Sequence, residues 1–349
     1  MNAFTNYLEK LGNNFLVAAM VPSLALVVAS LLMFDPILHI AGSFQTAKET
    51  SQWIGIGVIV FIVTVVIGYT LTVLNTHVLK FYEGYIVPFP FRFVYNKAQR
   101  VYRQKAKALM EQRDAIKKEY QHLRKFHNQH PVATQRLEEL KDYFYEVASE
   151  YDTTYPANLD DVLPTRFGNQ LRAAEDHAVQ RYGFDGVTFW PRLIHVIPES
   201  YRATIDSARN EVSFLANLSI LSGVFSALCI FAIIHVMWTT DVVSGNKVVF
   251  EAFMLGALRY LVAAVAGLAG FFLFYKASIV SLGSFTGTIR SAFDLFRLDL
   301  LRKLEVQRPK NFNEEFDTWQ NINELIVIGN QSVTFRPFKY RPERSSSQQ

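Results

Sequence analysis

The chain has 349 residues, half of them hydrophobic, with 35 Lys and Arg against 31 Asp and Glu for a net charge of +4. Its mean hydropathy of +0.12 is high for a soluble protein of this length, although a charged fraction of 19% leaves room for a water-exposed domain. The single cysteine, Cys229, excludes an intramolecular disulfide and a cysteine-based zinc site.

Four long apolar stretches divide the chain. The second is the clearest, because the residues from Trp53 to Leu74 carry no charge. A helix needs about 20 apolar residues to cross a ~30 Å hydrocarbon core, and lipid forces each segment to satisfy its own backbone hydrogen bonds. The sequence therefore predicts an all-α integral membrane protein with four transmembrane helices, at 15–34, 53–74, 214–238 and 253–275.

The first apolar stretch differs from a cleaved signal peptide. Residues 1–14 lack a positively charged region, and an apolar run of about 20 residues is longer than the core of such a peptide. Pro22 lies inside the stretch, where a membrane helix tolerates proline with a kink. We expect a retained span.

The distribution of Lys and Arg predicts the orientation. Twelve of the 35 lie in 77–130, eight in 131–212 and eleven in 276–349, whereas the connections 35–52 and 239–252 carry one each. Basic residues accumulate on the cytoplasmic side of a membrane. We therefore expect an inner-membrane protein whose two termini, long central loop and tail all lie in the cytoplasm.

This topology predicts four segments. An N-terminal transmembrane hairpin (1–76) is followed by a helical cytoplasmic insert (77–212), a second transmembrane hairpin (213–276) and a cytoplasmic tail (277–349). The basic first part of the insert would lie beside an anionic leaflet, which favours the lipid bilayer as its partner. Nucleic acid is a disfavoured alternative, because no nucleic-acid-binding motif accompanies the charge.

The insert begins with two predicted helices, at 94–126 and 132–151. Leu109, Ile116 and Leu123 recur every seven residues in the first of them, as in a short coiled coil. The first helix is basic and the second acidic. We expect them to form an antiparallel hairpin.

The rest of the insert predicts a helix ending at Gly183, with Asn158 or the aspartates after it as caps. The stretch 183–193, GFDGVTFWPRL, predicts a turn with a short extended or re-entrant piece. A further helix should start at Pro198 and run without a break into the third span.

The tail predicts an amphipathic helix after the fourth span, then a helix at 313–328, one possible strand at 333–340 and disorder beyond it. The apolar face of the amphipathic helix can lie on the inner leaflet or pack against the insert, and the pattern leaves both open. This face consists of Phe285, Ile289, Phe293, Phe296, Leu300 and Leu304.

Two blocks of sequence carry a resemblance to a known group. Residues 163–175 read LPTRFGNQLRAAE, with RYGFD at 181–185 and WPRL at 190–193, and residues 292–297 read AFDLFR. These blocks resemble a group of uncharacterised bacterial four-span integral membrane proteins, a likeness that implies no activity, cofactor or catalytic residue. The order of hairpin, basic loop, hairpin and tail is also similar to that of flagellar-motor-type stator subunits, by topology alone.

A block of opposite charges is the densest candidate site. One interpretation is an anion site or a subunit contact, and the other is a salt-bridged packing network. The spacing of Arg172 and Asp176 is that of a local helical ion pair, which favours the network. The residues singled out are Arg166, Arg172, Glu175, Trp190 and Arg192.

Three residues in the spans are further candidates for interaction or gating. Arg259 lies in the fourth span near its outer end, where an ionisable residue is a functional candidate but can also reach the interface. His235 lies one turn from the outer end of the third span. Gly267 belongs to a face of small residues that permits close helix contact, within one chain or between subunits.

No motif for nucleotide, metalloprotease or serine-hydrolase chemistry is present, and His122, His127 and His130 straddle a predicted helix end without acidic neighbours. We therefore expect no catalytic residue, cofactor or metal. The predicted function is that of a non-enzymatic scaffold or regulator, whose helical cytoplasmic domain binds a protein partner. The alternative is a homo-oligomeric pore or an ion-conducting, stator-like unit.

Overall fold

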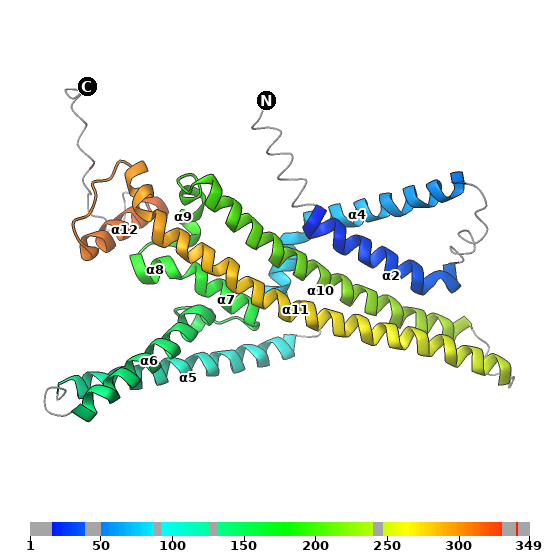
Figure 1. Ribbon diagram of the computed structural model, residues 1–349, viewed down its shortest axis with the longest axis horizontal. Coiled ribbons are helices and arrows are strands. Elements are labelled where there is room, and N and C mark those ends of the chain that lie inside the picture. Colours follow the sequence, from blue (N-terminus) through cyan, green and yellow to red (C-terminus); the bar gives the residue numbers. More distant parts are fainter. Residues whose placement is uncertain are drawn as a thin grey trace, which may run out of the picture. The chain divides into compact units, whose positions relative to one another are not determined.

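The computed structural model describes residues 16–38, 50–86, 92–125, 131–239, 247–329 and 340 (Figure 1). Within these ranges the chain is helical and contains no strand, and one isolated bridge joins Val306 to Tyr340. The predicted strand at 333–340 and the predicted disordered end lie almost wholly outside the described residues, as does most of the HNQHP turn.

Four of the helices are long and apolar enough to cross a membrane, as the sequence predicts. They contain the candidate spans Val17–Phe34, Gly57–Glu83, Glu199–Trp238 and Gly256–Lys303. The corresponding helices are α2 (Val21–Leu38, preceded by the π-helical turn η1, Leu16–Met20), α4 (Thr50–Glu83), α10 (Glu199–Thr239) and α11 (Lys247–Lys303).

Two of these helices are much longer than a bilayer requires. Helix α10 has 41 residues and α11 has 57. At 1.5 Å per residue they extend for about 62 and 86 Å, against a hydrocarbon core of ~30 Å. The helix predicted to start at Pro198 and run unbroken into the third span is confirmed.

The chain forms two compact units. Unit 1 comprises residues 1–80 and 209–281, and unit 2 comprises residues 81–208 and 282–349. Helices α4, α10 and α11 each contribute residues to both units.

Within unit 1, small residues let α10 and α11 approach closely. A Cβ added to Gly267 would lie 3.0 Å from the Ser222 carbonyl oxygen and 3.1 Å from the Ser226 Cβ. Two serines bond across the pair: Ser219 Oγ donates to the Phe271 carbonyl and Ser226 Oγ to that of Ala264. The small-residue face around Gly267 therefore packs within one chain.

Unit 2 contains the predicted helical hairpin, formed by α5 (Arg92–Arg124) and α6 (Pro131–Thr154). Its seam buries Ile116 against Leu140 and Val147, with Leu109 and Leu123 packed beside them. Polar contacts mark the antiparallel direction: Arg136 pairs with Glu119 at 3.1 Å, whereas Gln112 contacts Tyr143 farther along the seam. The seven-residue pattern and the opposite charges predicted this pairing correctly.

The segment after the hairpin corrects two expectations. The single helix predicted to end at Gly183 is two helices, α7 (Arg166–Glu175) and α8 (His177–Tyr182), and the N-cap of α7 is Thr165. The extended or re-entrant piece is wrong, because α9 (Gly186–Leu193) is a helix. The side chain of its N-cap, Asp185, accepts hydrogen bonds from the backbone N–H groups of Val187 and Thr188. These bonds stabilise the first turn of α9, which the neighbouring glycines disfavour.

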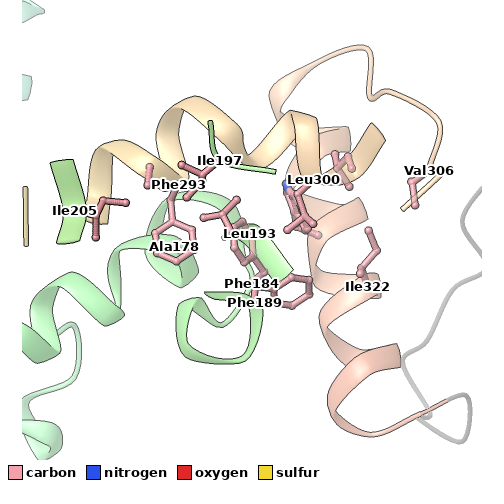
Figure 2. Packing of buried hydrophobic residues seen from close by; sticks show 13 residues of the cluster. Ala178, Phe184, Phe189, Leu193, Ile197, Ile205, Phe293, Leu300, Val306 and Ile322 are labelled. Carbon is pink, nitrogen blue, oxygen red and sulfur yellow. The ribbon is translucent and has the colours of Figure 1, made fainter. Parts of the chain in front are cut away.

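An aromatic core holds α8, α9, α11 and the C-terminal helix α12 (Phe312–Val327) together (Figure 2). Phe184 lies 4.3 Å from Trp319 and 5.8 Å from Phe293, between ring centroids. The predicted apolar face of α11, with Phe293 and Leu300 at its centre, therefore packs against the insert. The N-cap of α12 is Asn311, whose side chain accepts a hydrogen bond from the Glu314 N–H at 2.9 Å.

Candidate functional site

Arg172 is the centre of the predicted charged block. Its guanidinium lies 3.2 Å from Glu175, 3.7 Å from Asp176 and 3.8 Å from Asp161. Burial raises the pKa of the Glu175 carboxyl, against the lowering effect of Arg172. Burial likewise raises the pKa of Asp176, which accepts a hydrogen bond from the Ala157 N–H at 2.9 Å. One cation thus compensates two partly buried carboxylates, those of Glu175 and Asp176, and lies near the exposed carboxylate of Asp161.

The other members of the block lie apart from Arg172. Arg166 is exposed in the first turn of α7. Arg192 donates to the Thr188 carbonyl of its own helix at 2.7 Å, and Trp190 packs on Phe293 at 5.8 Å between ring centroids. The residues of the charged block therefore make separate local contacts, and Arg172 is the member that several carboxylates share.

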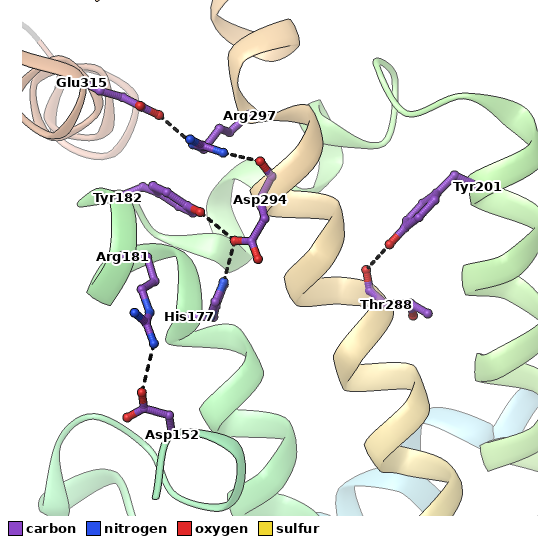
Figure 3. Close-up of polar contacts among 9 residues, drawn as sticks. All are labelled: Asp152, His177, Arg181, Tyr182, Tyr201, Thr288, Asp294, Arg297 and Glu315. Carbon is purple, nitrogen blue, oxygen red and sulfur yellow. Dashed lines mark hydrogen bonds and ion pairs between the residues drawn. The ribbon is translucent and has the colours of Figure 1, made fainter. Parts of the chain in front are cut away.

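A second polar network joins α8, α11 and α12, and Figure 3 shows it. The Asp294 carboxylate accepts a hydrogen bond from the Tyr182 hydroxyl at 2.7 Å and contacts His177 Nε2 at 2.8 Å. Arg297 pairs with Glu315 of α12 at 2.6 Å and lies over the Tyr182 ring, 4.2 Å from its centroid. Sequence reasoning missed Asp294 and Glu315, because no local pattern predicts a partner so distant along the chain.

Burial raises the pKa of the Tyr182 phenol to about 12, and its hydrogen bond to Asp294 adds to the increase. The phenol is therefore a neutral hydrogen-bond donor at any physiological pH. Both of its neighbours on α11 depend on it: Asp294 accepts its hydrogen bond, and the Arg297 guanidinium lies over its ring. Tyr182 thus fixes the last turns of α11 against α8.

A cleft of about 610 Å³ opens beside this network. It lies between the α5–α6 hairpin and the pair formed by α8 and α11. Its charged residues are Arg113, Asp114, Lys117, Asp152, Arg181 and Arg290, with His177 at the edge shared with the network. Arg290 is the cation that closes the cleft on the α11 side, where Nη2 donates to the carbonyls of Asp152 and Thr153 at 3.2 and 3.3 Å.

Arg259 has a structural partner in unit 1. Its Nη2 donates to the carbonyls of Leu32 and Met33 in α2, at 2.6 and 3.1 Å. Pro36, four residues after Leu32, has no N–H to donate to that carbonyl. The guanidinium therefore supplies the hydrogen bond that the proline removes from α2.

Asn217, which no sequence pattern distinguishes, likewise donates a hydrogen bond to a carbonyl freed by a proline, at the start of the first span. Its buried Nδ2 donates to the Ala18 carbonyl at 2.7 Å. Pro22, four residues after Ala18, has no N–H, and the backbone immediately before it is π-helical. Both prolines of α2 thus free a carbonyl, and side chains of α10 and α11 donate hydrogen bonds to the two carbonyls.

The two remaining candidates differ in their surroundings. Gly267 is buried at the α10–α11 contact, and His235 lies on an exposed face of α10. In the described ranges no group of three or more His, Cys, Asp or Glu side chains is placed to hold a metal ion.

Comparison with protein-family models, with curated proteins and with solved structures found no match to this chain. Membership of the bacterial four-span group stays a prediction.

Proposed function

We propose that this chain is a non-enzymatic multi-pass membrane protein that acts as a scaffold or regulator through the helices of unit 2. In this proposal unit 2 lies in the cytoplasm together with both termini, in the inner membrane of a bacterium. The orientation is supported by the basic residues, 31 of 35 of which lie in two segments. The chain's partners are then the lipid bilayer and a cytoplasmic protein.

The observation that carries the proposal is the continuity of two helices. Helices α10 and α11 have their apolar stretches in unit 1 and continue without interruption into unit 2. In unit 2, α11 ends within the aromatic core, and the Tyr201 hydroxyl of α10 donates to the Thr288 carbonyl at 3.1 Å (Figure 3). A binding event in unit 2 would therefore act on helices that also contain the spans.

The α5–α6 hairpin is the surface that we propose for the partner. Much of it is exposed, and the aromatic residues Tyr143 and Tyr145 are 44% and 60% exposed on α6. Exposed aromatic rings between charged side chains are typical of protein-binding surfaces. Because the apolar seam between α5 and α6 does not include Tyr145, its ring is not needed to hold the hairpin together.

Site-specific photo-crosslinking in living cells tests the proposal. A photoreactive residue in place of Tyr145 should give a protein adduct of one defined mass, whereas the same residue in place of Val265 should not. Val265 is a matched control, because it is also 60% exposed but lies in the apolar part of α11. The absence of a protein adduct from every exposed α5 and α6 position would overturn the scaffold proposal.

The alternative, a homo-oligomeric pore or ion-conducting unit, has less support. Its lining would come from the small residues of the third and fourth spans, and Gly267, Ser219 and Ser226 make contacts between α10 and α11 of one chain. Single-channel recording in planar bilayers distinguishes the two. Reproducible conductance that Gly267→Leu abolishes would support the pore and contradict the scaffold.

A further inference from the structure

The cleft between the α5–α6 hairpin and the α8–α11 pair has the dimensions of a small-molecule site. Its volume of about 610 Å³ lies within the ~300–1,000 Å³ range typical of ligand pockets. All of its lining residues belong to unit 2, so the cleft is a feature of one compact unit.

The lining carries an excess of positive charge. Two of its arginines have a carboxylate in the cleft: Arg113 lies 3.4 Å from Asp114, and Arg181 lies 3.1 Å from Asp152. The other two cations, Lys117 and Arg290, form no ion pair among the residues that the structure describes. The cleft therefore has two cations more than it has carboxylates.

Arg290 is the informative one of the two. It is partly buried, and its guanidinium donates hydrogen bonds to the carbonyls of Asp152 and Thr153. Its Nε is buried and has no hydrogen-bond partner among the described residues. Burial lowers the pKa of Arg290, although the carboxylates of Asp152 and Asp294 lie near enough to oppose that effect. An anion in the cleft would supply a counter-charge in direct contact and the missing acceptor.

The cleft also presents aromatic surface. Phe144 and Tyr145 line it from α6, with their ring centroids 6.1 Å apart in an edge-to-face arrangement. The Tyr145 side chain is largely exposed. A planar base stacks favourably on such a ring, and phosphate oxygens are the acceptors that guanidinium groups bind best.

We propose that this cleft binds a nucleotide, with its phosphates at Arg290 and Lys117 and its base against Tyr145. The inference does not depend on the proposed scaffold function. It requires only the cleft of unit 2, and it assigns no chemical step to the ligand. As a consequence, the ligand would join the α5–α6 hairpin to α11, because Lys117 lies on α5, Tyr145 on α6 and Arg290 on α11.

Titration calorimetry on the full chain in detergent, with ATP as the probe, tests this inference. We expect saturable binding that weakens with salt, and a loss of affinity of about tenfold or more in Arg290→Met. Arg302→Met is the matched control, because Arg302 is an exposed arginine of the same helix that pairs with Asp299 outside the cleft. It should bind ATP as the unchanged protein does.

Further arms separate the parts of the proposal. Lys117→Met changes an exposed residue of α5 and keeps the test valid if Arg290→Met fails to fold; it should also weaken binding. Tyr145→Ala should weaken ATP binding and leave that of inorganic pyrophosphate unchanged. Pyrophosphate binding as tight as that of ATP would overturn the assignment to a nucleotide. The absence of saturable ATP binding, or equal binding by Lys117→Met and Arg302→Met, would overturn the site.

Discussion

Truncation of Phe293 tests the aromatic core that holds the end of α11 in unit 2. The side chain is 2% exposed and contacts the rings of Phe184 and Trp190, both at 5.8 Å between centroids. Phe→Ala in a core costs about 3–5 kcal/mol, depending on how far the site collapses. Phe293 also lines a shallow groove of about 220 Å³. Neighbouring side chains can shift into the space left by the truncated ring, so we expect a destabilisation at the lower end of this range, about 3 kcal/mol.

A decrease of about 3 kcal/mol in the free energy of unfolding raises the equilibrium constant for local opening by about two orders of magnitude. Amide hydrogen exchange of the detergent-solubilised chain measures this opening. In Phe293→Ala the amides of α9 and α12 should exchange faster by that factor, because both helices pack on this core. The amides of the α5–α6 seam, which has its own apolar cluster, should change far less.

Leu295→Ala is the matched control. Leu295 lies two residues away on the same helix and is 61% exposed, so its truncation should change stability by no more than about 0.5 kcal/mol. Equal exchange rates for α12 in the two variants would refute the reasoning, since they would mean that α12 opens without disturbing the core around Phe293.

Three further predictions follow from other features. Tyr182→Phe should lower the free energy of unfolding by about 1 kcal/mol at pH 7. Because folding raises the pKa of Tyr182 to about 12, the neutral phenol stabilises the fold below pH 10, and this stabilisation is lost as the pH rises toward 12. The variant should therefore show a smaller fall in melting temperature over that range. Asn217→Leu should lower the free energy of unfolding in detergent by about 0.6–1.7 kcal/mol. The double variant that also carries Pro22→Ala, which restores a backbone N–H donor, should recover most of that loss. In a cysteine-free chain, an impermeant maleimide applied to intact cells should label a cysteine placed at Ser43 and spare one at Ser149; labelling of both would contradict the orientation.

Features governed by local sequence were predictable. The spans follow from the absence of charge over about 20 residues, and the α5–α6 seam follows from apolar residues at heptad spacing. The start of α12 follows from Asn311 and the two glutamates after it. In each case one stretch of chain contains both the signal and the structure that it specifies.

Two kinds of feature were not predictable in this way. In α9, Gly186 and Pro191 obscured a short helix, although Asp185 followed by Thr188 was a readable cap. The contacts of Asp294 and Asn217 join residues 112 and 199 positions from their partners. Such contacts depend on tertiary packing, which hydrophobic periodicity alone does not specify.

The hydrogen bonds to the first span have a consequence for biosynthesis. The carbonyls of Ala18 and Leu32 receive their side-chain donors only from residues 217 and 259, about 200 residues later in the chain. At about 5–20 residues per second, translation leaves a delay on the order of 10–40 s. During that time two backbone oxygens of the first span lack these donors in a medium that contains no water. The nascent N-terminal segment therefore lacks two of its hydrogen bonds until the third and fourth spans enter the bilayer.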